Sequence, residues 1–394
     1  MIRAFHFSCE GESHKATNKV CQDYSLTYNK NDLTIAIVCD GHGGERYFRS
    51  DIGAKYAAEA TLESVSLFVE QIDEKLLSKR PFTAVGPTSE IDDAEQLSET
   101  DIAFRRLFSS IIYKWNERIE QHAKETALTD WEKENVPPKY LDEFASASSY
   151  EKYYGCTLMT YVQTPQYWFA FHLGDGKCVS FQDEPFWKEP IPWDDRCFLN
   201  KTTSLCDTSA IDEFRYCYQG DRKFPFAVFL GSDGMDDSFG EDENLVDFYI
   251  QIMKMLVNEG KEATEHSIEI ELPKLSAIGS KDDMSIAFVY DEDTLISHFS
   301  VFLQYQLDKT DDAIRKMEEK LNTLSQKLEN VQGKAESDDK ARIEANYAQQ
   351  DIIKTKDYLL KLQNRRDTLL SQFPVQNPSQ DNDKLDGEEQ NINT

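Results

Sequence analysis

The stretch Leu33–Gly44, LTIAIVCDGHGG, decides the fold of this chain. Its first seven residues are mostly apolar and β-branched, as in a strand that is buried on both faces. The strand ends at Asp40, and the glycines that follow let the backbone approach a ligand closely. Similar apolar strands lie beside acidic residues at 167–175 (YWFAFHLGD), 226–234 (FAVFLGSDG) and 282–290 (DDMSIAFVY). Helices are expected at about 46–76 and 101–126, so these residues predict a domain of mixed strands and helices.

The charge and composition of the chain exclude several classes of binding partner. The chain has 394 residues and a formal net charge of -29, which argues against nucleic acid and against an anionic membrane surface. We expect no signal peptide and no membrane span, because neither an apolar leader nor an eighteen-residue apolar run is present. None of the eight cysteines forms a CxxC pair. We therefore expect a cytoplasmic protein with reduced thiols.

The C-terminal region has a different pattern. Residues 308–373 carry equal numbers of acidic and basic side chains, so the acidic excess lies almost entirely in residues 1–307. Apolar side chains recur at heptad spacing in two series, 307–331 and 341–373. The pattern predicts helices over 293–373, as an antiparallel hairpin or as one dimeric coiled coil with a stutter. Asp293 or Thr294 is expected to cap the start of the first helix. Gly333 is expected to end that part of the pattern and Ser337 to cap the next helix. Pro374 is expected to end the last helix, before a disordered acidic tail at 374–394.

Five aspartates stand at or near the ends of the expected strands. They are Asp23, Asp40, Asp175, Asp233 and Asp282. An Asp-Gly pair alone is more often a turn than a ligand, but several converging carboxylates would repel one another unless cations lay among them. Such hard oxygen ligands suit magnesium, manganese or calcium better than zinc.

The ordered motifs resemble those of the metal-dependent type 2C protein serine/threonine phosphatases, especially the bacterial branch. They are CQD, DGHGG, GCT, GDGK, SDGMDD and KDDMS, in this order along residues 21–285. The resemblance covers roughly residues 5–290. It implies an α+β fold, a four-layer α–β–β–α sandwich over residues 1–292, with Mn²⁺ or Mg²⁺ bound at one end. It implies two ions, with a third, weaker one beside Asp175.

The resemblance also implies roles for single residues. Asp40 would bridge the two ions and His42 would act as the general acid, although His42 orienting a metal-bound water is the alternative. Asp23 would act through water. The implied metal ligands are Asp40, Gly41, Asp233, Asp282, Asp23 and Asp175. Because a metal-activated water attacks phosphorus in line, no Cys or Ser nucleophile is needed.

Two residues depart from the family pattern. Gln22 stands where the family usually has Glu, and Asn18 stands where it has a phosphate-binding Arg. His14, Lys15 or Lys19 could supply the missing cation, and we prefer His14 and Lys15. Residues 180–224 correspond to a variable flap beside the cleft. Its Trp187 and Trp193 either pack within the flap or form a substrate surface, whereas His172 is expected in the core.

The sequence therefore predicts a metal-dependent hydrolase of phosphoserine and phosphothreonine in proteins. Its partners would be phosphoprotein substrates from a serine/threonine kinase pathway, and its C-terminal helices would serve homodimerisation or partner docking. Two alternatives remain: an interaction scaffold that keeps the fold without turnover, and an adaptor or filament in which the helical region is the functional core.

Overall fold

The computed structural model describes residues 1–86, 97–198, 201–332 and 339–373. The chain divides into two compact units, Met1–Ile296 and Ser297–Thr394. The expected break at Gly333, the cap at Ser337, Pro374 and the expected tail at 374–394 lie outside the described residues. Within the described ranges, no helix is both long and apolar enough to cross a lipid bilayer.

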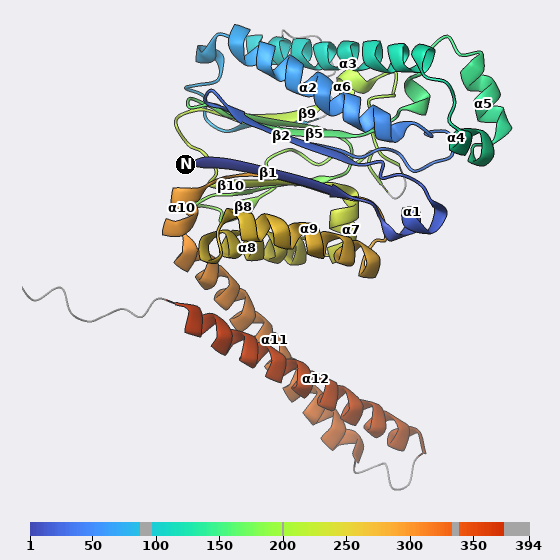
Figure 1. Cartoon of the computed structure of the whole chain (residues 1–394). Helices are drawn as coiled ribbons and strands as arrows, with labels where there is room; N and C mark the ends of the chain where they lie inside the picture. Colours follow the sequence, from blue (N-terminus) through green and yellow to red (C-terminus); the bar gives the residue numbers. More distant parts are fainter. Residues whose placement is uncertain (87–96, 199–200, 333–338, 374–394) are drawn as a thin grey trace, which may run out of the picture. The chain divides into compact units, whose positions relative to one another are not determined.

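Two antiparallel sheets form the centre of the first unit (Figure 1). One has the strand order β1-β11-β10-β7-β8, made of Ile2–Cys9, Met284–Asp291, Ala227–Gly231, Lys177–Phe181 and Trp187–Lys188. The other has the order β2-β3-β5-β6-β9-β4, made of Tyr24–Lys30, Leu33–Cys39, Leu158–Gln163, Trp168–Leu173, Arg215–Gln219 and Thr83–Val85. The DGHGG stretch thus directly follows a central strand.

Helices cover the outer face of each sheet (Figure 1). The long helices α2 (Ser50–Gln71) and α3 (Glu99–Glu125) pack on the six-stranded sheet, while α7 (Asp233–Phe239), α8 (Asp242–Asn258) and α9 (Lys261–Ile278) cover the five-stranded sheet. Along β3, Ile35 and Ile37 belong to the cluster under α2 and α3, whereas Ala36 and Val38 pack between the sheets. Both faces of the strand are buried, which explains its unbroken apolar run. The predicted α–β–β–α sandwich is confirmed.

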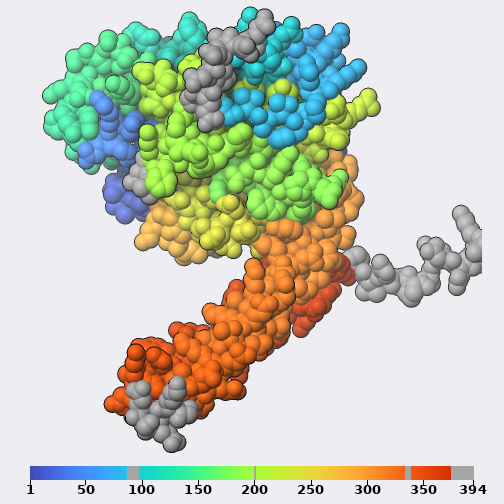
Figure 2. All heavy atoms as spheres, turned by 180° about the vertical axis from the view of Figure 1, so that it is seen from behind, coloured from blue at the N-terminus to red at the C-terminus, as the bar shows by residue number. Residues whose placement is uncertain are grey.

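Shorter elements fill the connections between these layers. They are α1 (Glu12–Thr17), α4 (Asp130–Asn135), α5 (Pro138–Ala145), α6 (Ala210–Glu213) and the 3₁₀ turns η1 (Glu74–Leu76) and η3 (Glu151–Tyr153). On the face seen in Figure 2, the green and yellow-green residues that include much of the flap form a continuous surface on the first unit.

The two long helices of the first unit differ from their expected bounds. The expected helix at 46–76 is shorter, because Arg49 has φ -126° and ψ 25° and precedes the first helical residue. The expected helix at 101–126 begins earlier, because Ser98 and Asp101 form a reciprocal capping box. Part of the connection between the two helices is the short strand β4, which pairs with β9.

A buried ion pair fixes the start of α2. The guanidinium of Arg49 donates to Glu132 Oε1 at 2.6 Å and to the Tyr154 hydroxyl at 3.1 Å. Both charged side chains are almost fully buried, so removing either partner would leave an uncompensated charge. Since α2 begins at Ser50, a few residues after the DGHGG stretch, this pair also fixes where the connecting loop ends.

The second unit is a helical hairpin of α11 (Phe299–Gln332) and α12 (Asp339–Gln372). An ion pair of 2.6 Å joins Asp311, early in α11, to Arg366, late in α12, so the helices run antiparallel. Every seventh side chain of α12 is buried: Ala341, Ala348, Thr355, Leu362 and Leu369. The packing of α11 on α12 confirms the hairpin form of the predicted heptad segment.

The helical region begins differently from the expectation. The helix α10 spans Glu292–Ser297, so Asp293 and Thr294 lie inside it and the predicted cap at either residue is wrong. Asp291, the last residue of β11, accepts hydrogen bonds from the Asp293 backbone N–H at 3.2 Å and the Thr294 hydroxyl at 3.0 Å. A strand-end carboxylate therefore supplies the capping group.

Candidate functional site

The five predicted aspartates are placed by strand ends from both sheets. Asp40 follows β3 and Asp23 precedes β2, both in the six-stranded sheet. Asp233 is the first residue of α7 after β10, and Asp282 lies just before β11, both in the five-stranded sheet. Asp175 lies in the turn between β6 and β7, which joins the two sheets.

Burial and repulsion between neighbouring carboxylates act together on this set. Burial, together with the charges of Asp233, Asp23 and Asp175, raises the pKa of Asp40 well above its usual value. Burial raises the pKa of Asp233 to about 6, with the charges of Asp175 and Asp282 adding to the effect. Asp40 and Asp233 also share a side-chain hydrogen bond, which requires a proton on one of them when no cation is bound.

Asp23 is the most constrained member of this set. Burial raises its pKa well above the usual value, followed by the charges of Asp283 and Asp233. Its Oδ2 atom is buried without a hydrogen-bond partner. An orphaned, buried carboxylate oxygen beside other carboxylates fits a hard divalent cation or the water bound to one.

The side chains alone do not supply all the oxygen ligands that a divalent metal ion needs. Among the residues that the structure describes, no three His, Cys, Asp or Glu side chains form a ready-made metal cluster. Backbone carbonyls and water would have to supply the remaining oxygen ligands, as is common for Mg²⁺. The carboxylate chemistry therefore fits such an ion, with part of its coordination shell left to non-carboxylate oxygens.

The backbone around Asp40 and Gly41 is held closely. The Asp40 N–H donates to Thr157 Oγ1 at 3.0 Å, and the Thr157 N–H donates to the Asp40 carbonyl at 2.8 Å. A Cβ atom at Gly41 would lie 2.5 Å from the Gln22 carbonyl oxygen, so only glycine fits there. The GCT segment thus fixes the loop that presents the predicted carbonyl ligand.

The side chain of Gln22 donates hydrogen bonds to the DGHGG loop, which an ionised glutamate could not do. The two N–H groups of its side-chain amide are shared among the Ser50 hydroxyl, the His42 carbonyl at 3.2 Å and the Tyr47 carbonyl at 3.4 Å. An ionised carboxylate can only accept, so it would meet two carbonyl oxygens without a proton to share. The departure from the family pattern stabilises the DGHGG loop.

Asp283 joins three segments, and it also lies close enough to Asp23 for its charge to raise the pKa of that carboxyl group. It accepts the backbone N–H of Gly11 at 2.7 Å and of Gln22 at 2.6 Å, and His14 Nδ1 lies 2.9 Å from its Oδ1. Burial alone would raise the pKa of Asp283, but His14 and the two backbone donors hold it below its usual value. Its neighbour Asp282 is exposed and remains the residue available to a metal ion.

The three candidate phosphate-binding cations lie in different places. His14 contacts Asp283, as above, and Lys15 is exposed with Nζ 3.7 Å from Glu12 Oε2. Lys19 instead reaches the DGHGG loop, where its Nζ donates to the Gly43 carbonyl at 2.8 Å. Burial lowers the pKa of Lys19, and the charges of Asp283 and Asp282 act against that shift.

The His42 ring is enclosed by the flap, residues 180–224. Its Nε2 lies 2.7 Å from the Ser204 hydroxyl, and Tyr47 packs edge-on with ring centroids 4.8 Å apart. Burial lowers the pKa of His42 to about 4, so the free ring is neutral at pH 7. Nothing in the sequence points to Ser204, because 162 residues separate it from His42 and it belongs to no motif.

The two flap tryptophans differ in exposure, and Arg215 of the flap supports a turn of the site. Trp187 is half-buried in β8, whereas Trp193 is 47% exposed. His172 is buried, and Arg215 donates to its Nδ1 at 3.0 Å and to the Gly174 carbonyl at 2.5 Å. A buried arginine therefore holds the turn that carries Asp175, and no motif of the sequence predicts this contact.

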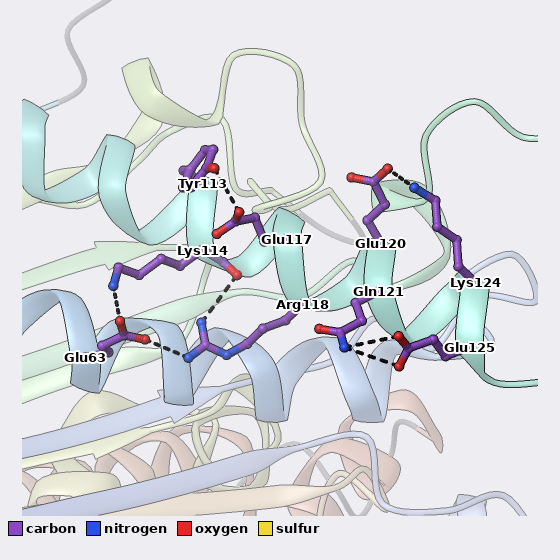
Figure 3. Close-up of a pocket in the computed structure, with 9 residues that line it drawn as sticks. All are labelled: Glu63, Tyr113, Lys114, Glu117, Arg118, Glu120, Gln121, Lys124 and Glu125. Carbon is purple, nitrogen blue, oxygen red and sulfur yellow. Dashed lines mark hydrogen bonds and ion pairs between the residues drawn. The ribbon is translucent and has the colours of Figure 1, made fainter.

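Surface depressions in the described part of the chain include two that contain none of the five aspartates. One of about 710 Å³ is lined by ion-paired side chains of α2 and α3, with Glu63 binding both Lys114 and Arg118 (Figure 3). It contains none of the predicted site residues. A second, of about 390 Å³, adjoins the site and is lined in part by Lys19, Gln22 and Trp131.

Comparison with known proteins identifies the family. The family model described as "Protein phosphatase 2C" matches residues 10–270, which is more than half of the chain. No curated protein matches the chain in sequence. Solved structures that resemble it include the serine/threonine phosphatase Stp1 from Staphylococcus aureus, with 16% identity and a TM-score of 0.42 over 74% of this chain and 95% of that one.

Two further solved structures are similar. They are PppA from Pseudomonas aeruginosa (15% identity, TM-score 0.42, 73% of this chain and 97% of that one) and the catalytic domain of PstP in complex with two manganese ions (15% identity, TM-score 0.38, 74% and 99%). The assignment rests on the family model, whose span contains all of the predicted site residues except Asp282. The chain belongs to the protein phosphatase 2C family.

Proposed function

We propose that this protein hydrolyses phosphoserine and phosphothreonine in other proteins with the help of Mn²⁺ or Mg²⁺. The observation that carries the proposal is the set of buried carboxyl groups around Asp40, whose pKa values are raised by burial and by the charges of the neighbouring carboxylates. A divalent ion bound there would lower the pKa of a water ligand and neutralise charge on the phosphate.

Each residue of the site has a proposed role. Asp40 and the Gly41 carbonyl would hold the ions from the β3 end, and Asp233 and Asp282 would hold them from the opposite sheet. Asp23 would act through bound water and Asp175 would serve a third, weaker ion. The set spans both sheets, so rigid packing of the sandwich would keep the oxygens in place.

The leaving group and the phosphate need groups of their own. His42 is proposed as the general acid, which it becomes once a bound phosphate dianion favours its protonated form. Phosphate binding by His14 and Lys15 stays a prediction. Lys19 is the better placed of the three cations, because its Nζ already contacts the loop between Asp40 and α2.

Hydrolysis of p-nitrophenyl phosphate and of a phosphothreonine peptide, with and without Mn²⁺, tests the proposal. The matched control is the double variant Asp40→Asn/Asp233→Asn, which keeps side-chain volume and removes two charges. We expect Mn²⁺-dependent turnover in the wild type only. Equal rates for the two proteins would refute the assigned activity.

The alternative function is a scaffold that keeps the fold without turnover. Asn18 favours it, since the family's arginine is missing there. Gln22 favours it less, because its amide stabilises the DGHGG loop. Calorimetric titration with Mn²⁺ separates the two functions: binding that the double variant lacks supports the enzyme, and no binding supports the scaffold.

We propose that residues 1–292 are the phosphatase domain and that the hairpin of residues 293–373 mediates self-association. Six large apolar side chains in the described part of α12 are exposed: Ile343, Tyr347, Ile353, Tyr358, Leu360 and Leu370. A second hairpin packed against them would remove this apolar surface from water. Light scattering tests this, with a dimer expected for the full chain and a monomer for residues 1–296; an unchanged state would remove the self-association role.

The proposed setting is cytoplasmic, with substrates supplied by serine/threonine kinases. If truncation to residues 1–296 abolished assembly but left turnover unchanged, the hairpin would be an assembly element separate from catalysis. If turnover were lost as well, the adaptor alternative, in which the helices are the functional core, would gain support.

A further inference from the structure

A turn of the flap reaches the predicted general acid. The Ser204 N–H donates to Asp207 Oδ2 at 3.0 Å, which closes the turn of residues 204–207. The turn is joined to the GCT segment, because the Leu205 N–H donates to the Cys156 carbonyl at 3.0 Å. It presents the buried Ser204 hydroxyl to His42 Nε2 at 2.7 Å. Asp207, which resembles an ordinary turn residue in sequence, therefore shapes a contact of the site.

The hydrogen bonds around Ser204 indicate which nitrogen of the His42 ring carries a proton. The Ser204 hydroxyl can donate to the Cys156 carbonyl at 3.1 Å, while its oxygen accepts the Cys206 N–H at 3.3 Å and His42 Nε2–H. Together with the Leu205 bond, this arrangement forms four hydrogen bonds. The Cys206 Sγ also lies 3.2 Å from the Ser204 hydroxyl oxygen. If Ser204 donated to His42 instead, its only proton would leave the Cys156 carbonyl, and only the weakly donating Cys206 thiol could replace that bond. The stronger network places a proton on His42 Nε2.

The ring has little freedom to leave this arrangement. A Cβ atom at Gly155 would lie 2.8 Å from both His42 Cδ2 and Cys206 Sγ, and 2.9 Å from Tyr47 Cδ1. The imidazole is therefore enclosed by the backbone at Gly155, the Tyr47 ring and the Cys206 thiol. No residue in the described part of the chain bonds to Nδ1 of His42.

We propose that Ser204 is a positioning residue that anchors His42 through Nε2 and leaves Nδ1 as the atom that transfers the proton. This inference rests on the proposed phosphatase function. As the P–O bond breaks, the Nδ1 proton passes to the leaving serine or threonine oxygen, giving the free hydroxyl. The water that attacks phosphorus keeps one hydrogen on the released phosphate and its other proton restores His42. The Cys156 carbonyl supports the ring through Ser204, as the third group of a catalytic triad does.

The kinetic test compares two leaving groups. Phenyl phosphate has a poor leaving oxygen that must be protonated as the P–O bond breaks. The leaving oxygen of p-nitrophenyl phosphate is much better and needs little protonation. We expect Ser204→Ala to lower kcat for phenyl phosphate about tenfold, which corresponds to the loss of one positioning hydrogen bond. The same variant should lower kcat for p-nitrophenyl phosphate less than about twofold. Ser204→Thr should restore the rate. Ser209→Ala is the matched flap control, because Ser209 bonds to Glu213 and not to His42.

A double-mutant comparison isolates the route through His42. In a His42→Ala background, Ser204→Ala should cause no further loss. An equal loss for both substrates, or the same loss in the His42→Ala background, would overturn the positioning role and leave a general effect on folding.

A second readout does not depend on turnover. ¹⁵N-histidine NMR of the Mg²⁺-supplemented full chain, with His42 assigned by comparison with His42→Ala, should show the Nε2–H tautomer. Ser204→Ala should shift this resonance. An Nδ1–H tautomer in the wild type would overturn the proposal. If the wild type hydrolysed neither phosphoester, the proposed function would fail, and the NMR result alone would decide whether Ser204 anchors the ring.

Discussion

Replacing Asp233 with asparagine should stabilise the metal-free protein. The pKa of Asp233 rises from 3.8 to about 6 in the folded chain, because burial and neighbouring carboxylates disfavour its charge. That rise corresponds to about 3 kcal/mol, at about 1.4 kcal/mol for each pKa unit. The variant keeps a hydrogen bond to Asp40, since an amide N–H can donate where the two carboxyl groups now share a proton.

One effect opposes this gain. Asp233 is the first residue of α7, where a carboxylate interacts favourably with the helix N-terminus by about 0.5 kcal/mol. The net gain is therefore about 2.5 kcal/mol at pH 7.5, or about 4 °C in the melting temperature of the first unit, at about 2.1 cal/mol/K of unfolding entropy per residue. A raised folded-state pKa means that wild-type stability falls as pH rises from about 3.8 to about 6, so the gain should vanish near pH 4.

The assay is thermal unfolding with a chelator, at pH 7.5 and at pH 4. Asp142→Asn, an exposed carboxylate on α5, is the matched control and should change little. Excess Mn²⁺ should reverse the order at pH 7.5, because ion binding adds about 2.7 kcal/mol at a hundredfold excess over Kd, and the variant lacks a ligand. A metal-free variant that melts at or below the wild type at pH 7.5, or gains equally at pH 4, would refute the reasoning.

Three further outcomes follow from the same structure. Lys19→Met should raise KM for p-nitrophenyl phosphate about fivefold or more, while Lys15→Met should not; equal effects would remove Lys19 from phosphate binding. Glu132→Gln should lower the free energy of unfolding by about 3 kcal/mol because it leaves the Arg49 charge buried, and a loss below about 1 kcal/mol in denaturant titrations would contradict this. Because the first unit carries most of the acidic excess, phosphopeptides with Arg flanks should be hydrolysed faster than matched peptides with Glu flanks; faster hydrolysis of the Glu-flanked peptide would count against the prediction.

Local patterns were sufficient for much of the fold. The apolar run before Asp40 predicts a strand because both of its faces are buried, and the strand spans the expected residues. The heptad series of 341–373 predicts the buried face of α12, since a helical repeat depends only on neighbours a few residues away. Helix ends were less certain, because they depend on single capping bonds such as Ser98 with Asp101.

The features of the site can likewise be separated into those that the sequence predicts and those that depend on the tertiary structure. The sequence by itself determined which carboxylates stand at strand ends, and the motif order determined the family. Only the tertiary structure decided how these groups are used: Gln22 binds the DGHGG loop, Asp283 joins three segments, and Ser204 reaches His42 from a flap 162 residues away. Hydrogen bonds between distant residues depend on sheet packing and on a few tenths of an ångström, and one-dimensional residue spacing carries no such information.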